Sequence, residues 1–332
     1  MTKVVLDAMG GDNSPYAMVQ GAVNAVKKNS ELFVFVVGPE DQINEELSKY
    51  DYPHNQIEVI HAPDVITCHE VPLEAIVRRN KSSMVIGYNV MKEKKADGIV
   101  SSGNSGALLV GGQFYLGKLK GVNRAFFAPI VPTVKGVALL VDGGANMDAR
   151  ASDLAQFAKI GSIYMEHAMG INEPKVALVN VGVEEEKGNE LVKEAYKLLS
   201  EEKNLNFIGN IESRDYPFGV ADVIVADAFV GNIILKLIEG LSAALIGAIK
   251  EGLKESIPSK IGAVLVKPKL KEVLGKFDVT EHGGAPILGM KGLVVKMHGS
   301  ATEKEVEHAL LQVDKYKKQN IEEIIQKYLT NE

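Results

Sequence analysis

The chain has 332 residues, 46% of them hydrophobic and 24% charged, and 37 lysines and arginines against 43 aspartates and glutamates give a formal net charge of −6. This ordinary globular composition excludes a disordered, fibrous or disulfide-rich protein. The single cysteine, Cys68, excludes an internal disulfide framework and a thiolate zinc site, and it favours a cytoplasmic protein. An acidic balance without a basic stripe argues against nucleic acid as a partner.

Short runs rich in valine, isoleucine and leucine alternate along the chain with polar, glycine-rich loops and helical patterns. This alternation predicts a mostly parallel sheet with strands buried on both faces, in a single α/β catalytic domain covering residues 1–332. The predicted strands are Lys3 to Leu6, Leu32 to Val37, Ile57 to Ile60, Gly98 to Val100, Val137 to Val141, Lys175 to Val179, Asp222 to Ala226 and Leu293 to Met297.

The most apolar stretch, Val230 to Ile249, is long enough to be considered as a membrane span, but Lys236 and Glu239 interrupt it. Its apolar residues recur at a spacing of three or four, which predicts an amphipathic helix facing the protein core. The tail from Thr302 to Leu329 has the pattern of a charged amphipathic helix.

Residues 250–277 depart from the alternation because no strand divides this helical segment, which Pro258 and Pro268 are expected to interrupt. Its seven lysines, Lys276 included, exceed its three glutamates, so the segment carries +4 and the rest of the chain −10. We expect it to project from the body of the protein.

Ligands of such sheets bind at the carboxyl ends of the strands, so the loops after the strands are candidate sites. In the first loop, Gly10 and Gly11 let the backbone approach a ligand, whereas Asp7 and Asp12 would repel a phosphate unless their charges are offset. Taken alone, this loop favours a glycine-rich turn over an anion site.

The loop Ser101 to Gly106, with the sequence SSGNSG, has no acidic neighbour, and its amides and hydroxyls could surround a phosphate or an oxyanion. It misses the Gly-x-Ser-x-Gly pattern, and no histidine or aspartate is placed to activate Ser105, so a serine acyl-enzyme has little support. The candidate residues here are Ser101, Ser102, Gly103, Asn104 and Ser105.

Four further loops follow later strands, at 142–146, 180–190, 227–232 and 281–286. Lys187 is a candidate cation for an anionic substrate, although a lysine in an acidic loop is usually solvated or paired. His282 lies in a glycine-rich loop, where a lone histidine is more often structural than catalytic. The other candidate substrate-binding residues of these loops are Asn146, Asn189, Asp227, Asn232 and Gly283.

The sequence lacks several known motifs for binding nucleotides and metals. Gly112 to Leu119 lacks the hydroxyl of a phosphate-binding loop and lies in a helical pattern, and no Gly-x-Gly-x-x-Gly follows a strand. No His-Glu-x-x-His motif or close carboxylate pair indicates a metal site. We therefore expect no metal and no cofactor.

Taken together, the loop motifs resemble the bacterial phosphate acyltransferases, which convert acyl-[acyl-carrier-protein] and inorganic phosphate to acyl phosphate. The resemblance spans almost the whole chain, with small departures from the family pattern at Ser102, Ser105, Ser213 and Ala228. Its motifs are DAMGGDNSP at 7–15, SSGNSGALL at 101–109, APIVPT at 128–133, DGGAN at 142–146, NVGVEEEKGNE at 180–190, DAFVGN at 227–232 and GGAPILGMKG at 283–292.

The resemblance implies a three-layer α/β/α fold similar to phosphate acetyltransferases and isocitrate-dehydrogenase-like enzymes. It also implies a homodimer, and a place in phospholipid synthesis ahead of the membrane glycerol-3-phosphate acyltransferase. Two rival readings are a nicotinamide-dependent decarboxylating dehydrogenase of the same fold and a non-catalytic scaffold that recruits lipid enzymes to membranes.

For the reaction, we expect phosphate held by loop amides and Lys187 to attack the thioester directly, while amides near Asn104 and Ser105 stabilise the oxyanion. In the projection, an apolar stripe flanked by lysines predicts peripheral membrane association, with a helical hairpin packed on a dimer partner as the alternative. The stripe consists of Ile257, Ile261, Val264 and Leu265.

Overall fold

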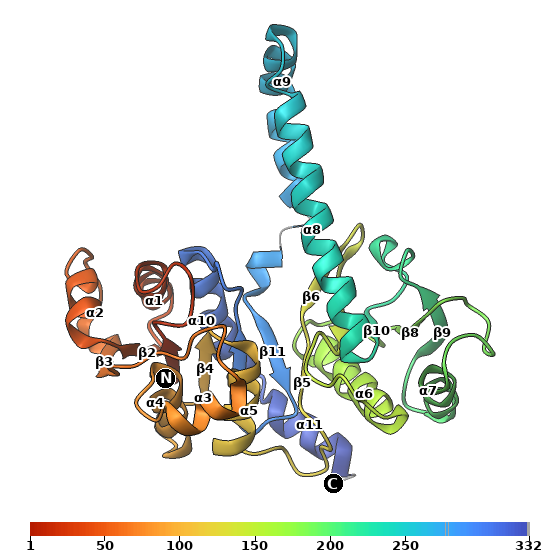
Figure 1. Cartoon of the computed structure of the whole chain (residues 1–332), viewed down its shortest axis with the longest axis horizontal. Helices are drawn as coiled ribbons and strands as arrows, with labels where there is room; N and C mark the ends of the chain where they lie inside the picture. Colours follow the sequence, from red (N-terminus) through yellow and green to blue (C-terminus); the bar gives the residue numbers. More distant parts are fainter. Residues whose placement is uncertain (276, 278, 331–332) are drawn as a thin grey trace. The chain divides into compact units, whose positions relative to one another are not determined.

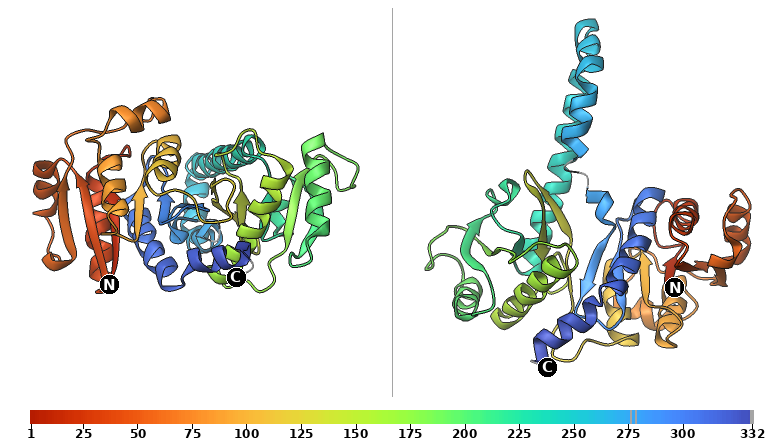
Figure 2. Two further views of the ribbon diagram at one scale, coloured as in Figure 1. Left: turned by 90° about the horizontal axis from the view of Figure 1, so that it is seen from below. Right: turned by 180° about the vertical axis from the view of Figure 1, so that it is seen from behind.

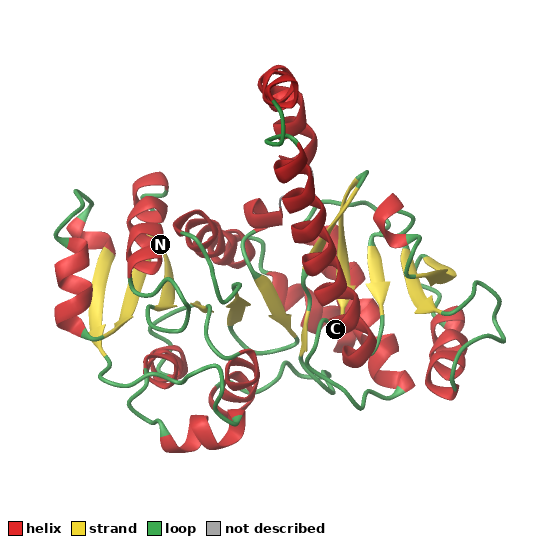
Figure 3. Ribbon diagram, turned by 45° about the horizontal axis from the view of Figure 1, so that its top comes forward, coloured by secondary structure: helices red, strands yellow, loops and turns green. Residues whose placement is uncertain are grey.

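The computed structural model describes residues 1–275, 277 and 279–330, so Lys276 lies outside the described residues. The chain forms two compact units, each with its own sheet (Figure 3). Unit 1 comprises Met1–Pro129, Lys159–Glu173 and Thr280–Glu332, and unit 2 comprises Ile130–Ala158 and Pro174–Val279. The sequence predicts that residues 1–332 act as one catalytic domain, and this stays a prediction for the two units together.

The sheet of unit 1 has the order β3-β2-β1-β4-β12-β11-β5 (Figure 1). Strands β3 to β12 in this order are parallel, while β11 pairs antiparallel with both β12 and β5. The strands are β1 (Thr2–Asp7), β2 (Leu32–Gly38), β3 (Ile57–His61), β4 (Gly98–Ser101), β5 (Phe126–Phe127), β11 (Ala285–Leu288) and β12 (Leu293–Lys296).

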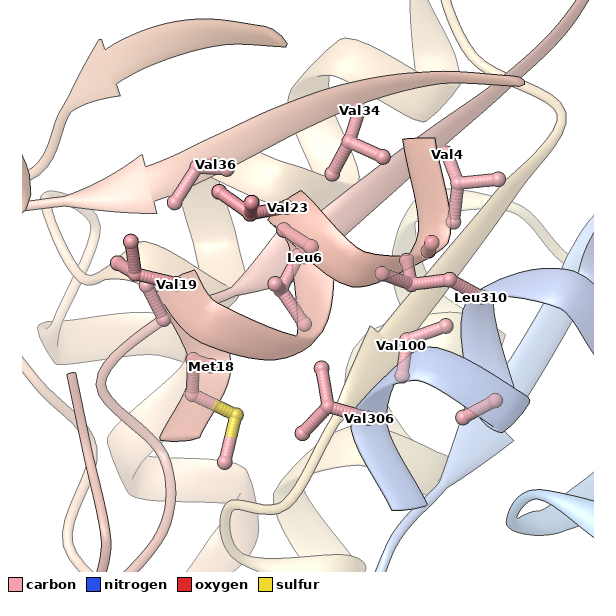
Figure 4. Close-up of a cluster of buried hydrophobic side chains, with 14 of the residues drawn as sticks. Val4, Leu6, Met18, Val19, Val23, Val34, Val36, Val100, Val306 and Leu310 are labelled. Carbon is pink, nitrogen blue, oxygen red and sulfur yellow. The ribbon is translucent and has the colours of Figure 1, made fainter. Parts of the chain in front are cut away.

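Helices cover both faces of this sheet, because successive side chains of a strand point to opposite sides. Val4 and Leu6 of β1 pack in a cluster with α1 and α10 (Figure 4), whereas Val5 contacts Gly87 of α4. The helices of unit 1 are α1 (Tyr16–Lys28), α2 (Glu40–Leu47), α3 (Pro72–Arg78), α4 (Ser83–Lys92), α5 (Ser105–Tyr115), α10 (Glu303–Lys318) and α11 (Ile321–Thr330), with the 3-10 turns η1 (His54–Gln56) and η3 (Val279–His282).

The sheet of unit 2 has the order β6-β7-β10-β8-β9, parallel except for the antiparallel pair of β6 and β7. Its strands are β6 (Ile130–Thr133), β7 (Gly136–Val141), β8 (Val176–Asn180), β9 (Phe207–Glu212) and β10 (Val223–Val225). Its helices are α7 (Glu190–Glu201), α8 (Ala228–Gly252) and α9 (Ile257–Gly275), with the 3-10 turn η2 (Tyr216–Phe218), and α6 (Ala151–His167) begins in unit 2 and ends in unit 1.

All eight predicted strands are confirmed, and so is the mostly parallel α/β fold. Four strands were not predicted, namely β5, β6, β9 and β11. They lie at or next to sheet edges, where a strand can be two residues long or contain Pro132, Gly209 or Pro286. Their sequences therefore lack the continuous apolar runs of the central strands.

The prediction that Val230 to Ile249 faces the core is wrong for most of its length. Ala228 and Gly231 of α8 are buried, and only a few further side chains, up to Ile238, pack against the core of unit 2. Beyond that point α8 and α9 form a hairpin that projects from this unit (Figures 1 and 2). By length and composition α8 could cross a membrane, and 6% of its most apolar window is buried.

The expected interruption of the projection by prolines is found beside Pro258, where α8 ends at Gly252 and α9 begins at Ile257, but it is wrong for Pro268. Pro258 is the second residue of α9, where its missing N–H costs no helical hydrogen bond, and Pro268 lies inside the same continuous helix. Likewise, the tail is two helices and not one, because Asn320 adopts a φ of 52° between α10 and α11.

Candidate active site

The buried carboxylate of Asp7, at the end of β1, holds two loops of unit 1 together. It accepts hydrogen bonds from Ser83 Oγ at 2.6 Å, from Ser101 Oγ at 2.7 Å and from the amide of Met9 at 3.2 Å. Ser101 Oγ in turn accepts a hydrogen bond from the Gly103 amide at 3.0 Å. The Asp7 carboxylate thus holds the start of the SSGNSG loop in place through hydrogen bonds from neutral donors.

Glycines allow the loops after β1 and β4 to touch. A Cβ atom on Gly10 would lie 2.5 Å from the Gly103 nitrogen, and one on Gly11 would lie 2.4 Å from Ser102 Oγ. The Asp12 amide donates to the Gly299 carbonyl at 2.8 Å, and the Asp12 side chain is exposed. The structure therefore brings Gly10, Gly11, Ser102 and Gly103 into one cluster with Asp12 at its rim.

The side chain of Asn104 caps α5 and is fully engaged. Its Oδ1 accepts from the Ala107 amide at 3.0 Å, and its Nδ2 faces the carbonyls of Thr67, Cys68 and Glu70 at 3.2, 3.4 and 3.0 Å. No acceptor among the described residues bonds the amides of Ser105 and Gly106 at the start of α5. These two amides, and not the Asn104 side chain, are therefore available to an anion.

Lys296 is a cation of this cluster that was not predicted from the sequence. Residues Lys296 and Ser101 are partners in the parallel pair of β12 and β4, and Lys296 Nζ donates to the carbonyls of Ser102, at 3.2 Å, and Met297. The only signal in the sequence was a lysine near the end of an apolar run. Its importance depends on strand pairing that the sequence does not reveal.

His282 and Gly283 pack beside α10. Gly283 has a φ of 80°, and a Cβ there would lie 2.4 Å from Gln312 Oε1, so this turn requires glycine. Burial lowers the pKa of His282; the nearby Lys315 and His308 lower it further, and Glu281 opposes them. The following Gly284 lies against the Lys296 carbonyl, which places the turn beside the end of β12.

In unit 2, the loop after β7 folds around the buried carboxylate of Asp142. Asp142 accepts hydrogen bonds from the amides of Gly144, Ala145 and Asn146 and from Asn146 Nδ2, at 2.7 to 3.0 Å. Burial raises the pKa of Asp142, while these hydrogen bonds act in the opposite direction. The Asn146 side chain therefore braces its own loop.

The same loop packs on the first turn of α8. Asp227 caps this helix, its Oδ1 accepting from the amides of Phe229 and Val230 at 2.9 and 3.0 Å. A Cβ on Gly144 would lie 3.5 Å from Cγ of Asn232, which places Asn232 against the loop. Asp227 and Asn232 are thus close to Asp142 and Asn146.

The loop after β8 carries Lys187. Asn180 Nδ2 donates to the Lys187 carbonyl at 3.1 Å, and Asn189 caps α7 through its Oδ1, which accepts from Val192 at 2.9 Å. The Lys187 side chain is exposed and forms no ion pair with any described residue. Its ammonium group is therefore available to a ligand.

A groove of about 940 Å³ lies within unit 2. One end is lined by polar residues of the candidate loops, among them Asn180, Asn189 and Asp227, together with Ser213 and Arg214. The remaining lining is mainly apolar and follows one side of α8, with Val230, Ile233, Ile234, Leu237, Ile238, Leu241, Ser242 and Leu245, and it includes Phe277. This groove could not be inferred from the sequence, because its walls come from separate strands, loops and α8.

The predicted residues therefore form two groups. Unit 1 holds Gly10, Gly11, Asp12, Ser101, Ser102, Gly103, Asn104, Ser105, His282 and Gly283, and unit 2 holds Asn146, Lys187, Asn189, Asp227 and Asn232. Each group lies at the carboxyl ends of parallel strands, where α/β sheets bind ligands. No group of three or more metal-ligating side chains occurs among the described residues.

Comparison with known proteins identifies the class. The fold is similar to the phosphotransacetylase from Streptococcus pyogenes (TM-score 0.63, 15% identity, 95% of this chain and 94% of that chain). It is also similar to the EutD phosphotransacetylase from Staphylococcus aureus (TM-score 0.59, 18% identity, with the same coverage) and to a 4-hydroxythreonine-4-phosphate dehydrogenase from Klebsiella pneumoniae (TM-score 0.52, 12% identity, 94% and 98%). These similarities confirm the expected fold.

The sequence comparisons give the family. The model of the family described as "Fatty acid synthesis protein" matches residues 2–323. The chain is 50% identical over 314 residues to a phosphate acyltransferase from Alkaliphilus oremlandii, covering 95% of this chain and 93% of the relative. It is 46% identical over 326 residues to one from Clostridium botulinum, covering 98% of both. The chain belongs to this family of phosphate acyltransferases.

Proposed function

We propose that the protein transfers a long-chain acyl group from acyl-[acyl-carrier-protein] to inorganic phosphate, giving acyl phosphate for phospholipid synthesis. Family membership supports the activity. The observation in the structure that carries the proposal is the open start of α5, where the Ser105 and Gly106 amides are without acceptors and the SSGNSG loop is pre-formed by Asp7. A preorganised set of neutral donors suits an oxyanion or a phosphate.

The proposed reaction is direct. A phosphate oxygen attacks the thioester carbonyl carbon, the tetrahedral oxyanion collapses, and the carbon–sulfur bond breaks to release the thiolate of the carrier. The leaving thiol has a pKa of about 8.5, so it departs without a strong general acid. No hydrogen bond between a histidine and Ser101, Ser102 or Ser105 occurs among the described residues, which argues against an activated serine nucleophile.

Radiolabelled acyl-carrier donor tests the direct route. Without phosphate, the protein should retain no covalent label after denaturation, and with phosphate the label should appear as acyl phosphate. A stoichiometric label on the protein in the absence of phosphate would require an acyl-enzyme and contradict the direct attack. Omitting a nicotinamide cofactor and divalent metal should not change the rate, which separates this activity from a dehydrogenase of similar fold.

For Lys187, the proposed role is recruitment of phosphate. Its exposed, unpaired ammonium group favours this role, because a cation binds the anionic substrate before and during the reaction alike. Lys187→Ala should raise the KM for phosphate most and leave kcat comparatively unchanged. Lys193→Ala, in the neighbouring α7, serves as the control for the loss of one positive charge. Unchanged phosphate kinetics in Lys187→Ala would remove this residue from the site.

We further propose that the hairpin tip binds the membrane surface. Ile257 and Leu265 are 75% and 76% exposed, and Ile261 and Val264 are also exposed on the same helix. Lys254, Lys260 and Lys267 around them form no ion pair with described residues. Apolar side chains can enter the lipid interface while each lysine contributes about 1 kcal/mol near an anionic surface.

Liposome flotation tests this role of the tip. Wild type should float with vesicles rich in anionic lipid, and Leu265→Glu should remain in the dense fraction while keeping its activity on soluble substrates. Val77→Glu introduces the same charge at an exposed position of α3, outside the tip, and should bind like wild type. Equal flotation of the Leu265→Glu variant and wild type would refute the assignment of the tip.

The remaining expectations concern location and partners. We propose a cytoplasmic homodimer that associates peripherally with the membrane and passes acyl phosphate to the membrane glycerol-3-phosphate acyltransferase. A labile amphiphilic product supports delivery at the bilayer surface. Light scattering of the purified protein tests the dimer, and co-flotation of the two enzymes in proteoliposomes tests their contact. Binding without any turnover would instead favour the non-catalytic scaffold.

A further inference from the structure

Unit 1 contains a pocket of about 480 Å³ that lies apart from the candidate active site. Residues at the amino-terminal ends of β4 and β12, Asp97 and Leu293 among them, line this pocket together with the ends of α4 and α5 and the turn from α10 into α11. The SSGNSG loop and Lys296 lie at the carboxyl ends of the same two strands. The pocket is therefore a separate site.

The lining of the pocket is rich in lysine and contains no arginine. Its lysines are Lys92, Lys94, Lys291 and Lys317. Lys317 pairs with Asp97 at 3.1 Å, and Lys92 Nζ lies 6.0 Å from the centre of the Tyr115 ring. Lys92, Lys94 and Lys291 form no ion pair with any residue that the structure describes. Three ammonium groups around the pocket are therefore available to an anion.

The turn that carries Lys291 is held in place by its neighbours. Lys291 belongs to the part of the GGAPILGMKG motif that the proposed reaction does not use. Its amide donates to the Gly117 carbonyl at 3.0 Å, and the following Gly292 adopts a φ of 80°. A Cβ on Gly292 would lie 2.7 Å from Met91 Cε in α4. These contacts keep the backbone of Lys291 at the edge of the pocket.

The first turn of α11 lies at the same pocket. Asn320, with a φ of 52°, turns the chain between α10 and α11, and residues 320–323 line the pocket. The Ile324 amide donates to the Asn320 carbonyl at 3.0 Å, but no acceptor among the described residues bonds the three preceding amides. The start of this helix therefore favours a negative charge, as the lysines do.

The acidic side chains of the lining, Asp97, Glu322 and Glu323, offset the lysines only in part. They are three against four lysines, and Asp97 is already bonded to Lys317 and to the Lys3 amide. Burial raises the pKa of Glu322 to about 7, so only about half of these carboxyls are ionised near pH 7. The pocket therefore keeps a positive charge.

These features together suit an organic phosphate. Lysine binds phosphate as a point charge, whereas a planar carboxylate is matched best by the fork of arginine, which this lining lacks. The volume of about 480 Å³ falls within the roughly 300–1,000 Å³ of small-molecule sites and leaves room for a carbon skeleton. Met91, Leu116 and Leu293 provide an apolar wall for that skeleton.

We propose that this pocket binds a soluble phosphate monoester, with its phosphate facing the lysines and the start of α11 and its carbon skeleton against the apolar wall. The inference does not depend on the proposed function. Because β4 and β12 are each four residues long, about 10 Å of strand separates the pocket from Ser101 and Lys296. The ester and the substrates of the active site can therefore be bound at the same time.

Calorimetry on the full chain tests this inference. Glycerol 3-phosphate and adenosine monophosphate serve as probes, because they separate a polyol phosphate from a nucleotide. At least one of them should bind wild type with a Kd below about 1 mM, and Lys94→Ala and Lys291→Ala should each weaken its binding about tenfold. Lys27→Ala removes the same charge from an exposed position of α1 outside the pocket and should bind the probe like wild type.

A second comparison separates the pocket from the candidate active site. Lys187→Ala should bind the probe like wild type, while Lys94→Ala and Lys291→Ala should keep the KM for inorganic phosphate. Saturation with inorganic phosphate should leave the affinity for the probe unchanged. Binding that falls in Lys187→Ala but not in the two pocket variants would place the ester in the active site and overturn the inference.

Three further outcomes would contradict the inference. One is that neither probe binds at about 10 mM, and another is that Lys27→Ala weakens binding as much as the pocket variants do. The third is that the variant with both Lys94→Ala and Lys291→Ala loses flotation on phosphatidic acid vesicles while neither soluble probe binds wild type, since the lysines would then hold a lipid headgroup. Circular dichroism establishes that each variant is folded. If an alanine variant fails to fold, Lys94→Gln or Lys291→Gln replaces it, with the same expected loss of binding.

Discussion

At the scale of single residues, the candidate site depends on side chains that hold loops in place. The Asn104 side chain forms its hydrogen bonds within the protein, to the Ala107 amide at the start of α5 and to the carbonyls of Thr67, Cys68 and Glu70. Asn104→Ala should therefore lower the free energy of unfolding by about 2 kcal/mol together with kcat. Asn104→Ser retains a capping oxygen but cannot reach these carbonyls, so it should restore part of the stability and less of the activity.

Urea unfolding and steady-state kinetics of both Asn104 variants check this prediction. If Asn104→Ala lost a hundredfold in kcat with unchanged stability, the side chain would be a direct oxyanion donor instead of a positioning group. The sequence identified Asn104 as important from its loop, but it could not distinguish these roles. The partners of its amide lie 34 to 37 residues earlier in the chain.

A second residue makes stability depend on pH. Burial raises the pKa of Glu322 from 4.5 to about 7, because its mostly buried carboxyl has one oxygen without a hydrogen-bond partner among the described residues. Below about pH 4.5 the carboxyl is protonated in both folded and unfolded chains and imposes no penalty. As the pH rises toward 7, the unfolded chain ionises first, so the folded state loses stability.

Glu322→Gln mimics the protonated acid and should remove this penalty. The variant should exceed wild type by up to about 3 kcal/mol in the free energy of unfolding at pH 8, and the difference should vanish near pH 4. Chemical denaturation across this pH range measures it. Glu323→Gln, an exposed neighbour, should show no comparable gain. A Glu322→Gln advantage that is constant with pH would mean that the pKa of the carboxyl is the same in the folded and unfolded chains.

At the scale of elements, the contact between α8 and the DGGAN loop sets the position of the groove. A Cβ on Gly231 would lie 2.0 Å from the Asp142 carbonyl oxygen, whereas Gly240 in the same helix has no neighbour within 4 Å. Gly240→Ala should therefore stabilise the protein by up to about 1 kcal/mol through helix propensity. Gly231→Ala gains the same helix propensity, but its methyl group would clash with the Asp142 carbonyl. This variant should therefore destabilise the protein and should reduce activity by displacing the DGGAN loop.

Thermal unfolding and turnover of the two alanine variants test this contrast. If Gly231→Ala matched Gly240→Ala in both measurements, α8 would not be pressed against the loop as described. The pair is well matched because it makes the same substitution in the same helix. The expected difference comes only from the tertiary contact.

The sequence predicts most of the fold because the central strands of parallel sheets are continuous apolar runs, as in Val4 to Leu6 and Val176 to Val179. It fails at the edges and at α8. Periodicity shows that a helix has an apolar side, but the same pattern results whether that side packs against a core, a ligand or a lipid surface. For this reason the exposed row of Leu237, Leu241 and Leu245 was mistaken for core.

The candidate site was predictable in part for a similar reason. Loops after strands identify Ser101 to Gly106 and Asp142 to Asn146 without any tertiary knowledge. The role of Asp7 in holding the loops could not be predicted, because its donors Ser83 and Ser101 are 76 and 94 residues away along the chain. Lys296 was missed because its neighbour Ser102 becomes adjacent only through the pairing of β12 with β4.

At the scale of the whole molecule, stability and charge are distributed unevenly. The described part of α9 has no buried residue, whereas β1 and the center of β2 are almost fully buried. Segments with few buried contacts open at low free energy, so amide hydrogen exchange should be fast in α9 and slowest in β1. The basic projection also differs in charge from the acidic remainder of the chain.

Hydrogen exchange with and without vesicles combines these two properties in one experiment. On anionic vesicles, amides of residues 257–266 should become protected, because the exposed apolar side chains of the tip enter the interface and stabilise α9. Protection should weaken as salt rises, since lysines provide part of the attraction. Exchange in β1 and β2 should remain unchanged, and neutral vesicles should protect the tip less. Protection of the tip that is already complete without vesicles would instead place this helix against another protein surface, as in a dimer.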